Sequence, residues 1–214
     1  MHDKSMSLRK EKAARLKLAV LEQTLKLIGK KPFDDLYIED ICEKVKISKV
    51  TLFKYFPTKE DILSYYLRVW CLRRLVELKD KPREGLQGVF YLFDKLSEDS
   101  ELNPGIILSL IAYLANPKRP LKPFSVKAEE KKLLFPGIPD VQSIDIQSID
   151  QMLEKFALEA IFKKEITRAT STRDVTNLLS ATFYGSVVTA QINQISPLKL
   201  FFRRNVELAL KGIQ

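Results

Sequence analysis

The sequence predicts an all-α protein in which a three-helix head is joined by a long fourth helix to a larger helical body. Only 7 of the 214 residues are glycine, whereas leucine, isoleucine, lysine and glutamate abound, and this composition favours helices. Apolar residues recur at three- and four-residue steps along most of the chain. A hydrophobic share of 45% and a charged share of 29% exclude a disordered tail and a fibrous protein.

The first helix is predicted over residues 8–28. Gly29 can end it in the left-handed conformation, and Pro32 prevents its continuation. Its apolar face carries Leu18, Leu21, Leu25 and Ile28.

Two short helices and a long one follow. Residues 38–45 form the second helix, with Glu39 and Asp40 in its first turn, where carboxylates suit the positive helix end. A break at Lys46 and Ile47 separates it from residues 49–56, for which Ser48 is a good N-cap. Leu52 and Phe56 are expected to face inward. Pro57 ends this helix, and Thr58 is expected to cap a fourth helix over residues 59–79.

Short helices separated by a tight turn and followed by a long helix are typical of a helix-turn-helix head joined to a helical body. We therefore divide the chain into a head, residues 1–58, and a body, residues 59–214.

The positive charge is concentrated in the head. The whole chain has a formal net charge of +9, and residues 1–60 contribute +5 of it, with 14 Lys or Arg against 9 Asp or Glu. The excess per residue is about three times that of the remaining chain. This concentration of positive charge suits a polyanionic partner, although most lysine-rich surfaces are simply solvated.

Residues 41–62, ICEKVKISKVTLFKYFPTKEDI, together with Phe33, Leu36 and Ile38, closely resemble the DNA-binding head of the TetR family of bacterial transcriptional regulators. The family pattern runs I-A-x-x-A-G-V-S, then K-G-T-L-Y-x-H-F, then P-S-K-E-x-L. The resemblance covers about residues 15–63 without gaps. Departures from the pattern are Tyr37 for threonine, Lys46 and Val50 for glycines, Phe53 for tyrosine and Tyr55 for histidine.

The resemblance implies that residues 49–56 enter the major groove of double-stranded DNA. Lys49 is expected at a phosphate or a guanine edge, Thr51 at a polar group or a thymine methyl, and Val50 at an apolar contact. Lys54 and Tyr55 are expected at phosphates, and Lys59 would hold a phosphate together with free N–H groups of the fourth helix. The predicted DNA-binding set is Tyr37, Lys46, Ser48, Lys49, Val50, Thr51, Lys54, Tyr55 and Lys59.

The body is predicted to be helical over residues 85–96, 106–115, 125–134, 149–166, 172–190 and 198–211, with proline-rich breaks at 116–123 and 135–139. The last helix is apolar over too much of its circumference for an ordinary surface helix. We therefore expect the last two helices of two copies to form a homodimeric four-helix bundle that buries the remaining apolar surface. In the family that this chain resembles, the final helices form the dimer interface, and this resemblance also implies a homodimer. Alternatively, both helices complete a monomer core. The expected interface residues are Leu179, Phe183, Val187, Phe201, Phe202 and Leu208.

In the family, the body also encloses a ligand cavity. Aromatic residues of this chain suit such a cavity and a hydrophobic effector, although each also suits plain core. These residues are Tyr66, Trp70, Phe90, Tyr113, Phe156 and Tyr184.

We therefore expect a transcriptional regulator: a homodimeric repressor released from a palindromic operator by a small molecule. The alternative is a dimeric helical adaptor whose degenerate head no longer binds DNA. An enzyme is not expected, because His2 is the only histidine and no nucleotide-binding or nucleophile motif occurs. Neither a cofactor nor a metal is expected. No apolar run approaches the length of a membrane span, and Cys42 and Cys71 show no disulfide framework, which predicts a cytoplasmic protein.

Overall fold

The protein is all-α in a computed structural model that describes residues 8–29, 31–116, 124–168 and 171–212. These residues form ten α-helices and two short 3-10 turns, and no β-strand occurs among them. The predicted fold class is therefore confirmed. His2 and the proline-rich residues 117–123 lie outside the described ranges.

The chain packs as two compact units. The first comprises residues 1–73 and 109–146, and the second comprises residues 74–108 and 147–214. Along their lengths, α4 (Asp61–Asp80) and α6 (Pro104–Leu114) each contribute residues to both units. The head lies within the first unit, and the division of the chain after residue 58 stays a prediction.

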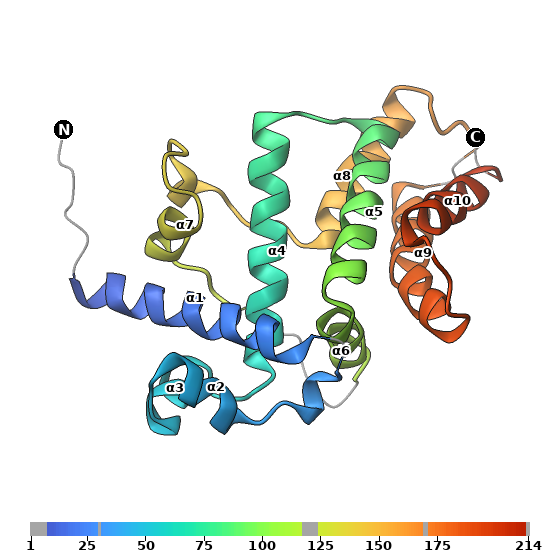
Figure 1. The fold of residues 1–214 in the computed structure, drawn as a ribbon. Helices are drawn as coiled ribbons and strands as arrows, with labels where there is room; N and C mark the ends of the chain where they lie inside the picture. The colour runs from blue at the N-terminus through green and yellow to red at the C-terminus, as the bar shows by residue number, and fades with distance from the viewer. Residues whose placement is uncertain (1–7, 30, 117–123, 169–170, 213–214) are drawn as a thin grey trace. The chain divides into compact units, whose positions relative to one another are not determined.

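The first unit contains α1 (Leu8–Ile28), α2 (Ile38–Val45), α3 (Lys49–Tyr55) and α7 (Ala128–Leu134). Helix α1 packs against both α2 and α7 (Figure 1). The core of this unit includes fully buried apolar side chains of the head, namely Val20, Phe33, Ile41, Leu52 and Phe56.

The helix boundaries in the head follow local signals. Helix α1 ends as predicted before Gly29, which has a left-handed φ of +50°. Helix α4 begins two residues later than predicted, at Asp61. In the turn before it, the Asp61 carboxylate accepts hydrogen bonds from the Thr58 backbone N–H at 2.7 Å and from the Thr58 hydroxyl at 2.9 Å. The Thr58 hydroxyl therefore donates a hydrogen bond in this turn, whereas the expected helix cap would accept one.

A buried ion pair joins α7 to α1. The Lys17 ammonium lies 2.7 Å from the Glu130 carboxylate, and their side chains are only 9% and 2% exposed. The same ammonium lies over the rings of Tyr65 and Phe124, at 5.2 and 4.8 Å from their centroids. The pair fixes α7 on the middle of the first helix.

The second unit contains α5 (Gly85–Leu102), α8 (Ile149–Phe162), α9 (Thr172–Ile192) and α10 (Leu198–Leu210). Helix α5 packs against α8 and α10, and α9 packs against the same two helices. The core between them is aromatic: Phe93 and Phe183 meet edge to face at 5.1 Å, and Phe156 and Phe202 are also buried.

Polar contacts fix the ends of these helices. Ser171 caps α9, because its hydroxyl accepts the Asp174 N–H at 3.1 Å. Glu101 on α5 accepts the N–H of Leu198, the first residue of α10, at 3.0 Å. Among the described helices, none is long and apolar enough to cross a membrane.

Candidate nucleic-acid interface

Helix α3 is anchored by its cap and by its inner face. The Ser48 hydroxyl oxygen accepts the Thr51 N–H at 3.1 Å and lies 2.9 Å from the Thr51 hydroxyl. On the inner face, Leu52 and Phe56 are fully buried, as predicted. Because a capped and anchored helix has a fixed rotation about its axis, the opposite face of α3 is held toward solvent.

The predicted DNA-binding residues all retain surface exposure. Those that are exposed are Tyr37, Lys46, Ser48, Lys49, Val50 and Lys54, and those that are half-buried are Thr51, Tyr55 and Lys59. The structure brings the α3 members onto the outer face of a single seven-residue helix. Their contacts with DNA stay a prediction.

Phe53 shares this outer face, although sequence reasoning did not place it in the site. Its side chain is 41% exposed, and Val50, one turn earlier, is 82% exposed. Neighbouring exposed apolar side chains on one face can contribute to a partner-binding surface. The three-residue spacing from Val50 is a signal that was available in the sequence.

Lys46 forms the tight turn between α2 and α3. It adopts a left-handed conformation, with φ 58° and ψ 49°. Its N–H donates to the Glu43 carbonyl at 3.2 Å, and the Ile47 N–H donates to the Cys42 carbonyl at 3.0 Å. The turn therefore keeps the geometry that a glycine normally provides, while it places a cationic side chain beside the start of α3.

Lys49, at the start of α3, is paired with Glu39 on α2. The ammonium donates a hydrogen bond to the carboxylate, and both side chains are more than half exposed. This hydrogen bond lowers the pKa of Glu39. A phosphate or a base edge would therefore compete with Glu39 for the Lys49 ammonium.

Lys59 is engaged within the head. Its ammonium donates to the backbone carbonyl of Asp34 at 3.1 Å and lies 4.7 Å from the centroid of the Phe33 ring. Burial lowers the pKa of Lys59. Since α4 begins at Asp61, Lys59 lies before the helix rather than in its first turn. It fastens the Phe33–Asp35 turn, and its contact with phosphate stays a prediction.

The aromatic residues predicted to contact an effector are divided between the two units. The first unit holds Tyr66, Trp70 and Tyr113, where the Ser64 hydroxyl donates to the Tyr113 oxygen at 3.1 Å. The second unit holds Phe90, Phe156 and Tyr184. Trp70 and Phe156 are 5% and 2% exposed.

The residues predicted for a dimer interface also differ in exposure. Leu179, Phe183, Val187 and Phe202 are buried in the core of the second unit, Phe201 is half-buried, and Leu208 is exposed. The buried members stabilise their own unit. The same two helices expose other large apolar side chains that sequence reasoning missed: Val188, Ile192 and Leu200.

Comparisons with known proteins agree with this geometry. Residues 20–66 match the family model for bacterial regulatory proteins of the tetR family, which confirms the resemblance seen in the sequence. No curated protein sequence gives a significant match.

Solved structures share the fold. FadR from Bacillus subtilis, in complex with stearoyl-CoA, has a TM-score of 0.64 and 16% identity over 92% of this chain and 99% of that chain. A TetR transcription regulator from Haloarcula marismortui has a TM-score of 0.61 and 15% identity over 93% and 98%. GusR from Salmonella enterica has a TM-score of 0.55 and 18% identity over 98% and 100%.

Proposed function

Because residues 20–66 carry the DNA-binding head of the TetR family, we propose that this protein is a sequence-specific transcriptional repressor that a small molecule releases from its operator. The observation that carries the proposal is α3, whose cap and buried inner face hold one face toward solvent. Such a helix reads base edges in the major groove, while surrounding groups bind phosphates.

The outer face of α3 separates base readout from phosphate binding. Thr51 and Lys49 supply polar groups for base edges, and Val50 and Phe53 supply apolar contacts of the kind that thymine methyls make. Lys46, Lys54 and Tyr55 flank them and bind phosphates. The concentration of positive charge in the head provides the affinity that does not depend on sequence.

A palindromic operator requires two heads spaced by about one DNA turn, ~34 Å, and thus a homodimer. The exposed apolar residues of α9 and α10 suit the interface better than the buried ones. Val188 and Ile192 lie one turn apart on α9, and Leu200 and Leu208 lie two turns apart on α10. Their exposed fractions run from 39% to 74%, and pairing with a second copy would remove that surface from water.

Release by an effector is a population shift. The dimer has two conformations, and in one of them the distance between the heads does not match the operator. A ligand that binds this conformation more tightly increases its population, and DNA binding weakens by the difference between the ligand's affinities for the two conformations. The similar regulator from Bacillus subtilis is known in complex with stearoyl-CoA, which supports a small-molecule ligand for this protein. The contacts of the six aromatic residues with an effector stay a prediction, and side chains of this kind suit a ligand with a substantial apolar part.

The test is fluorescence anisotropy with the promoter DNA beside the protein's own gene, over a series of salt concentrations. We expect wild-type binding to weaken steeply with salt, and Lys54→Ala to reduce the salt slope by about one unit per head. Lys211→Ala, which removes the same charge from the exposed end of α10, is the matched control and should leave the slope unchanged.

Absence of binding at every salt concentration, with the dimer intact, would instead favour the adaptor. The apolar surface of Val50 and Phe53 would then serve a protein contact.

A further inference from the structure

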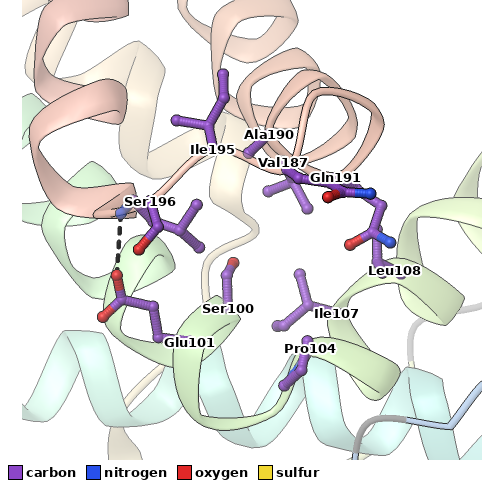
Figure 2. Close-up of a pocket in the computed structure, with 12 residues that line it drawn as sticks. Ser100, Glu101, Pro104, Ile107, Leu108, Val187, Ala190, Gln191, Ile195 and Ser196 are labelled. Atoms are coloured by element: carbon purple, nitrogen blue, oxygen red, sulfur yellow. Dashed lines mark hydrogen bonds between the residues drawn. The ribbon is translucent and has the colours of Figure 1, made fainter.

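The second unit contains a cavity of about 340 Å³ where the end of α5, the start of α6 and the α9–α10 connection meet (Figure 2). This volume falls within the range of small-molecule sites, ~300–1,000 Å³. None of the six aromatic residues predicted to contact an effector lines it. It is therefore a separate candidate site.

The walls of the cavity are apolar. Ile107 on α6 and Val187 on α9 are 3% and 4% exposed, and Ala190, one turn beyond Val187, is 6% exposed. Pro104, Leu108 and Ile195 add to the same lining. Such walls suit the hydrocarbon part of a ligand, because its transfer from water is favourable.

One end of the cavity contains a buried hydroxyl. Ser100 is 6% exposed, and its oxygen has no hydrogen-bond partner among the described residues. Figure 2 shows this hydroxyl pointing into the space between the α5, α6 and α9 side chains. A buried hydroxyl without a partner is unfavourable, so a polar group of a ligand at this place would stabilise it.

Glu101, the next residue on α5, also lines the cavity. One of its carboxylate oxygens accepts the Leu198 N–H at 3.0 Å, and the other is available to a ligand. Among the residues that line the cavity, Glu101 is the sole charged one, and Gln191 and Gln194 are neutral amides. The lining thus offers a negative charge and no positive one, which favours a cation and disfavours a carboxylate or a phosphate.

We propose that this cavity binds a lipophilic amine, with its hydrocarbon part among Ile107, Val187 and Ala190 and its ammonium group between Ser100 and Glu101. The inference rests on the proposed function, since it names the site and the chemical class of the effector.

The test compares three probes that share one hydrocarbon chain: decylamine, decanol and decanoate. Each is titrated calorimetrically into the full-length protein, without DNA and below the concentration at which the probe forms micelles or separates from water. We expect decylamine to bind about fivefold more tightly than decanol, because the pair with Glu101 is partly exposed. Decanoate should not bind.

Two variants locate the site. Glu101→Gln removes the charge but keeps an acceptor for the Leu198 N–H, so it should lower the affinity for decylamine to that for decanol. Glu154→Gln, at an exposed position on α8, is the matched control and should change neither affinity. Ala190→Leu narrows the cavity and should weaken binding of both, with an unchanged helical circular dichroism spectrum to confirm folding.

Equal binding of decanoate and decylamine, or unchanged decylamine binding in Ala190→Leu, would overturn the proposal. Because these titrations contain no DNA, a failure to bind the operator overturns the regulatory function and leaves the cavity result standing. Conversely, operator binding without amine binding overturns only the cavity proposal.

Discussion

The backbone N–H of Phe33 donates a hydrogen bond of 2.9 Å to the hydroxyl oxygen of Ser109, which lies 76 residues further along the chain. Phe33 begins the 3-10 turn that connects α1 to α2, and its side chain is 1% exposed. Ser109 lies on α6. The position of the turn before α2 therefore depends on a hydroxyl from far outside the head sequence.

Replacing Ser109 with alanine should destabilise the protein. The Phe33 N–H would lose its acceptor, and a polar group left without a partner costs about 1–3 kcal/mol. Urea denaturation followed by circular dichroism measures the change. Ser109→Thr retains the acceptor and should lose much less, whereas equal unfolding midpoints for Ser109→Ala and wild type would contradict the role of this bond.

The ion pair between Lys17 and Glu130 should show strong coupling. Glu130→Gln leaves the buried ammonium of Lys17 without its counter-charge, and this should cost about 3–5 kcal/mol. Combining Lys17→Met with Glu130→Gln removes both charges and should destabilise less than the sum of the two single changes. A double-mutant cycle from urea denaturation checks this, and simple additivity would show that the pair contributes nothing.

Lys46→Gly should change stability and DNA binding in opposite directions. Glycine relieves the side-chain strain of the left-handed turn, and we expect a gain of about 0.5–1 kcal/mol in the free energy of unfolding. The lost charge should weaken DNA binding and lower its salt dependence. Lys46→Ala loses the charge but keeps the strain, so equal thermal stability of the Gly and Ala variants would refute the strain argument.

The pairing of Asp94 on α5 with Arg203 on α10 predicts a loss of stability in acid. Burial raises the pKa of Asp94, but the hydrogen bonds and charges of Arg203 and Lys199 outweigh it and hold this pKa below its ordinary value. A lowered carboxyl pKa stabilises the fold above the unfolded value of about 3.9, and the effect is lost as the pH falls through the folded value.

Asp94→Asn should therefore be less stable than wild type at pH 7, by about 1 kcal/mol because Arg203 is partly exposed, and the difference should shrink as the pH falls through the lowered pKa of Asp94. Asp80→Asn, at an exposed position on α4, serves as the control. A difference between Asp94→Asn and wild type that is independent of pH would rule out the ion pair as its cause.

Local signals made the head predictable. Ser48 caps α3, Gly29 ends α1 and Lys46 forms the turn, because each of these features depends on a few neighbouring residues. The inward positions of Leu52 and Phe56 follow from helical periodicity for the same reason.

Contacts between distant segments were not predictable. Lys17 looks like one more solvated lysine of a basic helix, and only α7, more than a hundred residues later, makes it a buried charge. Likewise, periodicity identifies the apolar face of α9, but it cannot distinguish residues that pack inside the unit, such as Phe183, from those left for a partner, such as Ile192. That distinction depends on which helices surround α9.

Glu101 connects the cavity with the backbone of α10, since its carboxylate holds the N–H at which that helix begins. A cationic ligand at the second carboxylate oxygen would draw charge away from this bond and loosen the first turn of α10. Amide hydrogen exchange at Leu198 would then quicken on binding while the core amides of α9 exchange as before. The rate of amide exchange in the first turn of α10 would thus show whether the cavity is occupied.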